Sequence, residues 1–278
     1  MTIPVFTYFR LLQRYLRYFW NAKTKYDVHS PFVAELMAAV VDDDRNFYAF
    51  SAIEYLRQNL LHDTTFLNIK DFGAGSKVNA NPRRTVGNIT RYSAVPPAVG
   101  QLLFRLVHFS KPKKILELGS ALGISTLYMS AAAIDAQVIT VEGSQEIADK
   151  AKENFRKLNT SNVESLCGQF ETLLPLALEK LARLDFLFLD GDHRPKASLK
   201  YFDQCLPYAH HHSVFVIADI HWSAEMEQAW AILRQHPRVR LSVDLFYVGL
   251  LFFREENKEK EHFTLIKSRL KPWRIGLF

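Results

Sequence analysis

Short apolar runs alternate with amphipathic segments along most of this chain, and this alternation constrains its fold more than any other feature. Five apolar runs, typical of buried strands, lie near residues 114–118, 137–142, 162–167, 185–190 and 213–218. Segments with helical spacing lie near residues 124–133, 144–158, 171–182, 196–206 and 223–235. Strands that alternate with helices in this way predict a parallel sheet covered by helices on both faces.

The end of the pattern is different. Residues 239–246 and 247–254 are two strand-like runs with almost no residues between them. Parallel neighbours need a crossover of about a dozen residues, so this pair is predicted to be antiparallel. The predicted fold class is therefore α/β, Rossmann-like, with five parallel strands, a C-terminal antiparallel hairpin and an α-helical N-terminal extension.

The first strand runs into an unusual turn. Residues 113–126 read Lys-Lys-Ile-Leu-Glu-Leu-Gly-Ser-Ala-Leu-Gly-Ile-Ser-Thr, so Gly119 and Gly123 stand four apart between a strand and a helix. Glycines keep such a turn free of side chains, and open α/β sheets bind ligands at this edge. The spacing differs from the G-x-G-x-x-G of dinucleotide-binding proteins. A tight turn that binds nothing would show the same pattern.

The motif E-x-G-x-x-x-G formed by Glu117, Gly119 and Gly123 resembles motif I of class I S-adenosylmethionine-dependent methyltransferases. The run E-L-G-S-A-L-G-I-S-T is close to the form found in the catechol and caffeoyl-CoA O-methyltransferase branch. The resemblance covers about residues 90–254 and implies that five parallel strands with an antiparallel hairpin bind S-adenosyl-L-methionine (SAM). It also implies methyl transfer to a small-molecule acceptor, at oxygen, and contacts from Glu117, Gly119, Ser120 and Gly123 to the cofactor.

Further cofactor residues follow from the next strands. Glu142 ends the second strand, where a carboxylate can accept hydrogen bonds from two ribose hydroxyls. An acid just before the helix 144–158 would equally stabilise the N-terminus of that helix. After the third strand, the resemblance implies that Gln169 and Phe170 surround the adenine, although a loop residue and a core residue would look the same. The resemblance further implies that Ser93 contacts the cofactor carboxylate and that Asp190 also helps to bind the cofactor.

Acids and histidines gather after the fourth and fifth strands, where we expect the catalytic residues. Asp190 and His193 follow the fourth strand, and Asp219 and His221 follow the fifth. In metal-dependent O-methyltransferases, the positions of Asp190 and Asp219 hold a divalent metal such as Mg²⁺, but the position of the third ligand, an Asn, is Ile220 here. Without a metal, His193 or His221 is the expected general base. The sequence leaves both mechanisms open.

Composition limits the cell compartment and the partners. The 278 residues are 48% hydrophobic with net charge +6, which predicts a globular protein. We see no secretion signal and no apolar run of about 18 residues, the length of a membrane helix, and the two cysteines suit a reducing cytoplasm. No nucleic-acid motif is present. We expect a methyl acceptor as substrate, no nucleic acid, no transmembrane segment, and a homodimer that pairs along the run 246–253.

The first part of the chain is predicted to be a separate unit. Residues 1–90 would form a helical extension with a lid loop, and residues 91–278 the SAM-binding domain. Residues 71–97 are expected to be a long loop before a helix at 98–109. A helix over residues 5–20 carries an apolar stripe, with arginines between its members: Val5, Phe9, Leu12, Leu16 and Phe19. We favour a helix whose stripe packs on the core over a membrane-surface helix.

Two other functions fit the same fold class. A nicotinamide-dependent oxidoreductase would use the same sheet, although the glycine spacing and the terminal hairpin count against it. A methyltransferase-like binding protein without catalysis is the second alternative, because Ile220 removes one expected ligand position. Binding of SAM rather than NAD would distinguish a methyltransferase from the oxidoreductase. Methyl transfer to an acceptor would distinguish it from the inactive binding protein.

Overall fold

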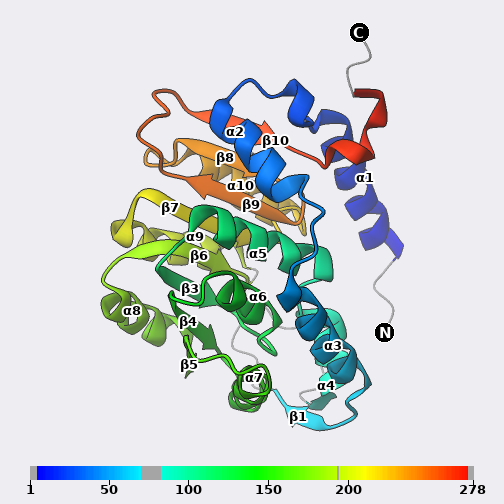
Figure 1. Cartoon of the computed structure of the whole chain (residues 1–278), viewed down its shortest axis with the longest axis vertical. Coiled ribbons are helices and arrows are strands. Elements are labelled where there is room, and N and C mark those ends of the chain that lie inside the picture. Colours follow the sequence, from blue (N-terminus) through cyan, green and yellow to red (C-terminus); the bar gives the residue numbers. More distant parts are fainter. Residues whose placement is uncertain (1–4, 70–82, 193, 275–278) are drawn as a thin grey trace.

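The computed structural model describes residues 5–69, 83–192 and 194–274 (Figure 1). Within these residues the main sheet has eight strands in the order β10-β8-β9-β7-β6-β3-β4-β5. Their bounds are β3 (Lys114–Leu118), β4 (Gln137–Glu142), β5 (Val163–Cys167), β6 (Leu184–Leu189), β7 (Ala209–Ala218), β8 (Leu241–Asp244), β9 (Val248–Phe252) and β10 (Glu261–Thr264). The strands β3 to β7 pair in parallel, which confirms the predicted parallel sheet.

The C-terminal strands confirm the hairpin and correct its surroundings. β9 pairs antiparallel with β7 and with β8, as predicted. β10, which we did not predict, runs parallel to β8 at the end of the sheet. The expectation that residues 246–253 offer a free edge is wrong, because β9 is hydrogen-bonded on both sides inside the sheet. The homodimer itself stays a prediction.

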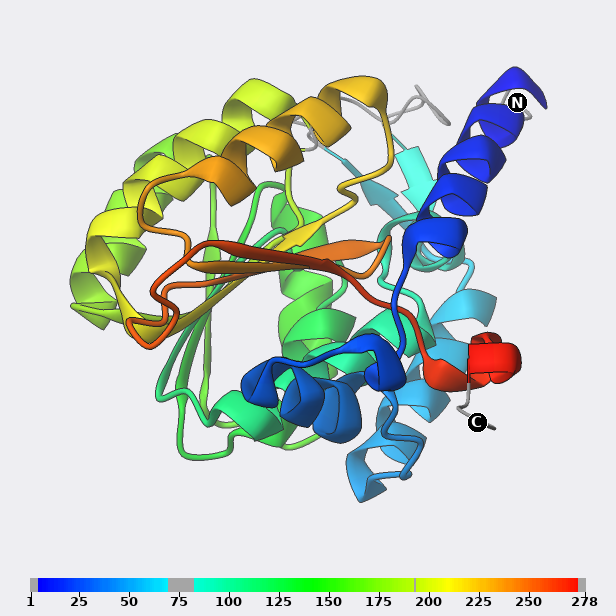
Figure 2. The same ribbon diagram turned by 90° about the horizontal axis from the view of Figure 1, so that it is seen from above.

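Helices cover both faces of the sheet (Figure 2). One face carries α2 (Pro31–Leu36), α3 (Tyr48–His62), α5 (Pro97–Ser110), α6 (Ile124–Ala132) and α7 (Gln145–Lys157). The other carries α8 (Phe170–Leu181), α9 (Pro195–Cys205) and α10 (Ala224–Gln235). Successive strand residues alternate between the two cores: Ile115 lies in the first and Leu116 in the second.

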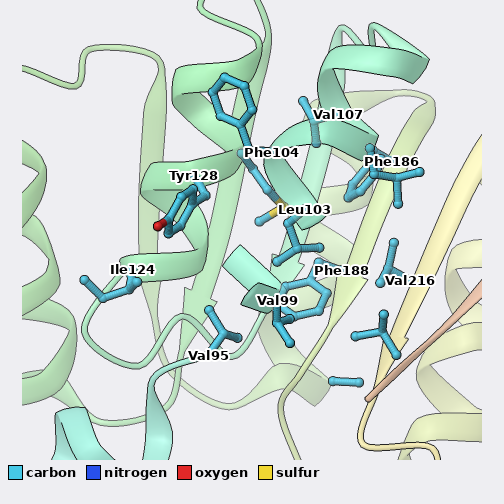
Figure 3. Packing of buried hydrophobic residues seen from close by; sticks show 14 of the residues in the cluster. Val95, Val99, Leu103, Phe104, Val107, Ile124, Tyr128, Phe186, Phe188 and Val216 are labelled. Carbon is cyan, nitrogen blue, oxygen red and sulfur yellow. The ribbon is translucent and has the colours of Figure 1, made fainter. Parts of the chain in front are cut away.

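The first core joins the N-terminal helices to the sheet. Figure 3 shows Leu103 of α5 beside Phe188 of β6, and Phe104 of α5 on the side of Tyr128. Residues of α2 and α3, such as Ile53, belong to the same cluster. The predicted division of the chain at residue 90 stays a prediction, and one continuous core crosses that position.

The segment 71–97 contains more structure than we predicted. Residues 70–82 lie outside the described residues. After them, β2 (Arg83–Thr85) pairs with β1 (Phe66–Asn68), and α4 (Val86–Ser93) follows. The Thr85 hydroxyl caps α4 by accepting from the Asn88 N–H at 3.2 Å. The loop prediction is therefore wrong for residues 83–93, because Val86 and Ile89 give this short stretch a buried helical face.

The N-terminal helix, α1 (Val5–Asn21), packs through a different face than predicted. Tyr15 and Tyr18 lie against Phe246, with ring centroids 5.0 and 5.2 Å away. The Tyr18 hydroxyl also donates to the Leu265 carbonyl. Phe9, Leu12 and Leu16, which we expected in the core, are exposed (55%, 52% and 45%). The helix is apolar on two sides, and the side that bears the tyrosines meets the aromatic ring of Phe246.

None of the helices formed by the described residues combines the length and the apolar character that a membrane crossing needs.

Candidate functional site

The turn after β3 has the backbone that we predicted. Gly119 and Gly123 adopt φ angles of +94° and +83°, which residues other than glycine rarely adopt. A Cβ on Gly119 would lie 2.8 Å from the backbone of Gly191, which stands two positions after the end of β6. The Gly119 N–H donates to the Val141 carbonyl at 2.9 Å. The ends of β3, β4 and β6 therefore meet around a turn of bare backbone.

Glu117 lies directly beneath this turn and is fully buried. Its Oε2 accepts from the Thr140 hydroxyl at 2.6 Å and from the Thr126 hydroxyl. Burial raises the pKa of Glu117 above its ordinary value, although these hydroxyl bonds work against the shift. The other oxygen, Oε1, makes no hydrogen bond of good geometry to a described residue, although the Ser125 hydroxyl lies near enough to lower the pKa of Glu117. A buried acceptor without a donor costs about 1–3 kcal/mol, so a ligand that donates a proton here would relieve that cost.

Glu142 stands at the end of β4, beside the same turn. Its Oε2 accepts from the Ala121 N–H and its Oε1 from the Ser144 N–H, both at 3.0 Å. Burial raises the pKa of Glu142, and the negative charge of Glu117 adds to the shift. Each carboxylate oxygen has a second lone pair. Glu142 is thus fixed by the turn and keeps acceptor capacity for the hydroxyls of a ligand.

Asp190 and Asp219 end the neighbouring strands β6 and β7. The Asp190 N–H donates to the Leu118 carbonyl at 3.0 Å, which joins it to the glycine turn. Burial raises the pKa of Asp190 well above its ordinary value, and the charges of Asp219 and Glu117 raise it further. The predicted strand-end acids therefore lie within electrostatic reach of one another.

These acids do not by themselves make a metal centre. In the part of the chain that the structure describes, no three or more His, Cys, Asp or Glu side chains are arranged to hold a metal ion. Ile220 points into the second core and is fully buried. Two carboxylates are few for Mg²⁺, although water and substrate oxygens often complete its shell. The metal site at Asp190 and Asp219 stays a prediction.

His221 has both ring nitrogens occupied. Its Nδ1 lies 2.8 Å from Glu227 Oε1, and its Nε2 lies 2.8 Å from Asp244 Oδ2. Burial alone would lower the pKa of His221, but the hydrogen bonds and charges of Asp244 and Glu227 outweigh it and raise the pKa. The arrangement favours a charged imidazolium between two carboxylates, with no nitrogen free to take a proton from a substrate. His193, the other candidate base, lies outside the described residues.

The residues predicted around the adenine begin α8. The Phe170 ring lies over the backbone of Gly191, where an added Cβ would come within 2.3 Å of it. It also meets the Tyr201 ring edge-on, with centroids 5.7 Å apart. Gln169 is exposed just before the helix. Phe170 thus borders the turn of Gly119, as the prediction requires, and Gln169 is free to contact a ligand.

Two serines were also predicted. Ser120 is buried within the glycine turn. Ser93 ends α4 and is exposed. Val95, two residues later, belongs to the same core cluster as Leu122 and Ile124 (Figure 3). The segment after Ser93 is therefore anchored in this core, and the Ser93 side chain makes no hydrogen bond to a described residue.

Sequence analysis missed the acids that hold His221. Asp244 ends β8 and Glu227 lies in the first turn of α10. Arg14 of α1 joins this group, since its Nε lies 3.3 Å from Glu227 Oε2. Asp244 carried a usable signal, because it ends an apolar strand as Asp190 does. No local signal relates Arg14 to a residue more than 200 positions away.

The electrostatic character of the site follows from four carboxylates around one turn: Glu117, Glu142, Asp190 and Asp219. Such a concentration of acids attracts cationic ligands and repels anionic ones. A dinucleotide brings a pyrophosphate to this edge of the sheet, where these acids would oppose it. The arrangement suits a ligand that carries positive charge and hydroxyl donors.

Residues 116–220 match a family model described as a methyltransferase domain. A catechol O-methyltransferase of Niastella koreensis is 33% identical over 116 residues, 41% of this chain and 52% of that protein. A transmembrane O-methyltransferase homolog of Mus musculus is 34% identical over 135 residues, 46% of this chain and 51% of that protein. The chain thus spans about half the length of the curated relatives it matches.

Solved structures share the fold. The SAH-bound methyltransferase PaMTH1 of Podospora anserina superposes with a TM-score of 0.56 over 82% of this chain and 98% of its own, at 15% identity. The O-methyltransferase TomG of Streptomyces achromogenes, in complex with SAM, gives a TM-score of 0.53 over 80% and 95% of the two chains, at 17% identity. These likenesses confirm the predicted α/β architecture.

Proposed function

We propose that this class I O-methyltransferase-like protein binds SAM at the glycine turn and transfers its methyl group to a small-molecule acceptor, at an oxygen atom. One observation carries the proposal: a turn of bare backbone is surrounded by Glu117, Glu142, Asp190 and Asp219. SAM is a sulfonium cation with an ammonium group and two ribose hydroxyls, so its charge and its donors match this edge. The comparisons support the same activity, and nothing in them favours a nicotinamide-dependent enzyme.

In this proposal the glycine turn contacts the methionine part of SAM through Gly119, Ser120 and Gly123. Glu117 Oε1 accepts a hydrogen bond from a donor group of the same part. Glu142 accepts from the ribose hydroxyls with its remaining lone pairs. Phe170 covers the adenine and Gln169 bonds its polar edge, while Ser93 contacts the cofactor carboxylate. When bound, SAM supplies an electrophilic methyl group.

The protein must position the acceptor and remove its proton. We assign the removal of this proton to Asp190, acting as the general base. Its raised pKa makes the carboxylate more basic, as a proton acceptor requires. Asp219 lies next to it and would share the site, with or without a divalent metal such as Mg²⁺. His221 positions β8 and α10, and His193 remains a second candidate base. An acid at the acceptor site also suits a hydroxyl-bearing acceptor, which it can orient by a hydrogen bond.

Thermal unfolding of the full chain with SAH, SAM, NAD or NADP, with and without Mg²⁺, tests the proposal. A ligand at about 100 times its dissociation constant stabilises the folded state by roughly 2.7 kcal/mol, which is a shift of about 2–4 °C for a protein of this size. We expect SAH and SAM to raise the midpoint and NAD to leave it unchanged. A rise with NAD alone would overturn the proposal.

Matched variants locate the ligand. Glu142→Gln removes a charge at the turn, and we expect it to weaken SAH binding by about tenfold. Glu179→Gln removes an exposed charge of α8 and should bind like the parent. Equal binding by both variants would exclude the ribose role of Glu142. SAH binding without turnover on any phenol, carboxylate or enol would favour the inactive binding protein.

The remaining assignments are part of the same proposal. We place the protein in the cytoplasm, without nucleic acid as a partner, and as a homodimer. Residues 91–278 would carry the SAM site, and residues 1–90 would shape access to it. Sedimentation equilibrium of the full chain would show a dimer or exclude it.

A further inference from the structure

One face of α1 is apolar and uncovered. Phe9, Leu12, Leu16 and Trp20 are exposed by 55%, 52%, 45% and 70%. Their spacing of three, four and four residues places them in a line along one side of the helix. The opposite side holds Tyr18, which is buried against the body of the protein. The exposed line is therefore on a helix whose position is fixed.

The C-terminal turns extend this surface. Trp273 is 64% exposed, and its ring lies 6.2 Å from that of Phe19 on α1. Lys271 Nζ donates to the Ala22 carbonyl at 2.6 Å, which ties the two segments together. Figure 1 shows the C-terminal turns (red) beside the C-terminal end of α1. We name the set Phe9, Leu12, Leu16, Trp20 and Trp273 the α1 surface.

The charged side chains of α1 itself are all basic. Residues 1–26 contain five basic residues and no acidic one: Arg10, Arg14, Arg17, Lys23 and Lys25. Arg14 turns inward to Glu227. The side chains of Arg17, Lys23 and Lys25 lie at exposed positions. An apolar, tryptophan-bearing stripe is thus flanked by cations.

We propose that the α1 surface docks on a membrane rich in anionic lipids, with α1 lying in the plane of the interface. Its Leu, Phe and Trp side chains suit the boundary between headgroups and acyl chains, where helices with basic polar faces bind. Arg17, Lys23 and Lys25 meet the negative headgroups. The charge complementarity between these residues and the lipids identifies the occupant.

A second copy of the chain fits the α1 surface less well. A twofold interface places the same patch of both copies face to face. The basic residues of one copy would then face those of the other, without an acid in residues 1–26 to offset them. Like charges at an interface suppress association. Electrostatics therefore favours the anionic bilayer.

Co-sedimentation of the full chain with vesicles tests this proposal. We expect binding to phosphatidylcholine vesicles that contain phosphatidylserine, weak binding to phosphatidylcholine alone, and a loss of binding as salt is raised. Trp20 and Trp273 should show blue-shifted emission on binding, because their rings leave water. Equal binding to both vesicle types would overturn the role of the cations, and no binding to either would overturn the proposal.

Two exposed variants separate the contributions. We expect Leu12→Gln/Leu16→Gln to weaken binding by at least about tenfold through lost apolar contact, and Arg17→Gln/Lys25→Gln to do so through lost charge. Ile232→Gln, at a 58% exposed position of α10, is the matched control and should bind like the parent. An equal loss in the control would contradict the assigned surface.

Sedimentation equilibrium of the same variants tests whether a second copy of the chain, rather than a membrane, covers the α1 surface. If Leu12→Gln/Leu16→Gln converted a dimer to a monomer, the α1 surface would be a contact between copies and the membrane proposal would fail. The replaced side chains are exposed, so unfolding midpoints should match the parent. SAH binding should also be unchanged, which keeps this test independent of the proposed methyl transfer.

Discussion

The two halves of the sheet's carboxyl edge treat their acids in opposite ways. Around β3, β4 and β6, Glu117 is buried and Glu142 and Asp190 are half-buried near one another's negative charge, and the pKa values of all three are raised. Around β7 and β8, Asp244 and Glu227 instead hold the imidazole of His221 between them. The charge of the first half is what the proposed binding of a cationic ligand requires. In the second half, the imidazolium of His221 offsets the charges of Asp244 and Glu227. Glu227 also holds α1 through its ion pair with Arg14.

The largest effect is expected at the glycine turn. Gly119→Ala places a Cβ 2.8 Å from the backbone of Gly191 at a φ of +94°. Strain and displacement should lower the free energy of unfolding by about 3 kcal/mol and abolish SAH binding. Urea denaturation and calorimetric titration measure the two effects. Ala121→Gly, at a neighbouring φ of +44°, is the control and should preserve both, so an equal loss there would contradict the explanation.

The second half of the edge should respond next. His221→Ala leaves Asp244 and Glu227 facing each other without the ring that joins them. We expect the free energy of unfolding to fall by about 2 kcal/mol, less than a fully buried ion pair would lose. Urea denaturation at a pH near 6 measures it. A fall below about 0.5 kcal/mol would show that the pair contributes little, and Trp222→Ala, beside it and partly exposed, should have the smaller effect.

The pH dependence distinguishes the two halves. The pKa of folded His221 is raised above the unfolded value of about 6.5. Its contribution is therefore fully present below the unfolded pKa and is lost as the pH rises through the folded pKa. The difference in unfolding free energy between the parent and His221→Ala should shrink as the pH is raised through that range. A difference that grew with pH would contradict the charged imidazolium.

The smallest effect is expected beneath the turn. Thr140→Val keeps the shape of the side chain but removes the hydroxyl that donates to Glu117 Oε2 at 2.6 Å. We expect a loss of about 1 kcal/mol, the value of one hydrogen bond, and a further rise in the pKa of Glu117. Thermal unfolding over a pH series measures both. Unchanged stability would mean that Glu117 is protonated and satisfied by other groups.

Much of the site was predictable because its signals are local. Gly119 and Gly123 mark a turn that only residues without a side chain fit, and each strand-end acid follows an apolar run. Parallel strands bring their carboxyl ends to one edge whatever the rest of the chain does. The placement of these acids at one edge of the sheet was therefore predictable from the sequence, and their roles stay predictions: Glu117, Glu142, Asp190 and Asp219.

The remainder depends on distant contacts that no local pattern encodes. Both sides of α1 are apolar in sequence, and the ring of Phe246 together with the Leu265 carbonyl selects the side with Tyr18. The spacing predicted that β8 and β9 pair, but it did not show the strand order, in which β9 lies between β8 and β7 and β10 forms the edge. His221 looked like a base until Asp244 and Glu227 closed on its two nitrogens.

The sequence by itself determined the alternating α/β order, the bare turn and the acids around it, because strand ends and glycine backbones follow from neighbouring residues. Only the tertiary structure decided which histidine nitrogens are occupied, which strand lies at the edge and which face of α1 meets solvent. Those outcomes depend on competition between surfaces that come together from opposite ends of the chain.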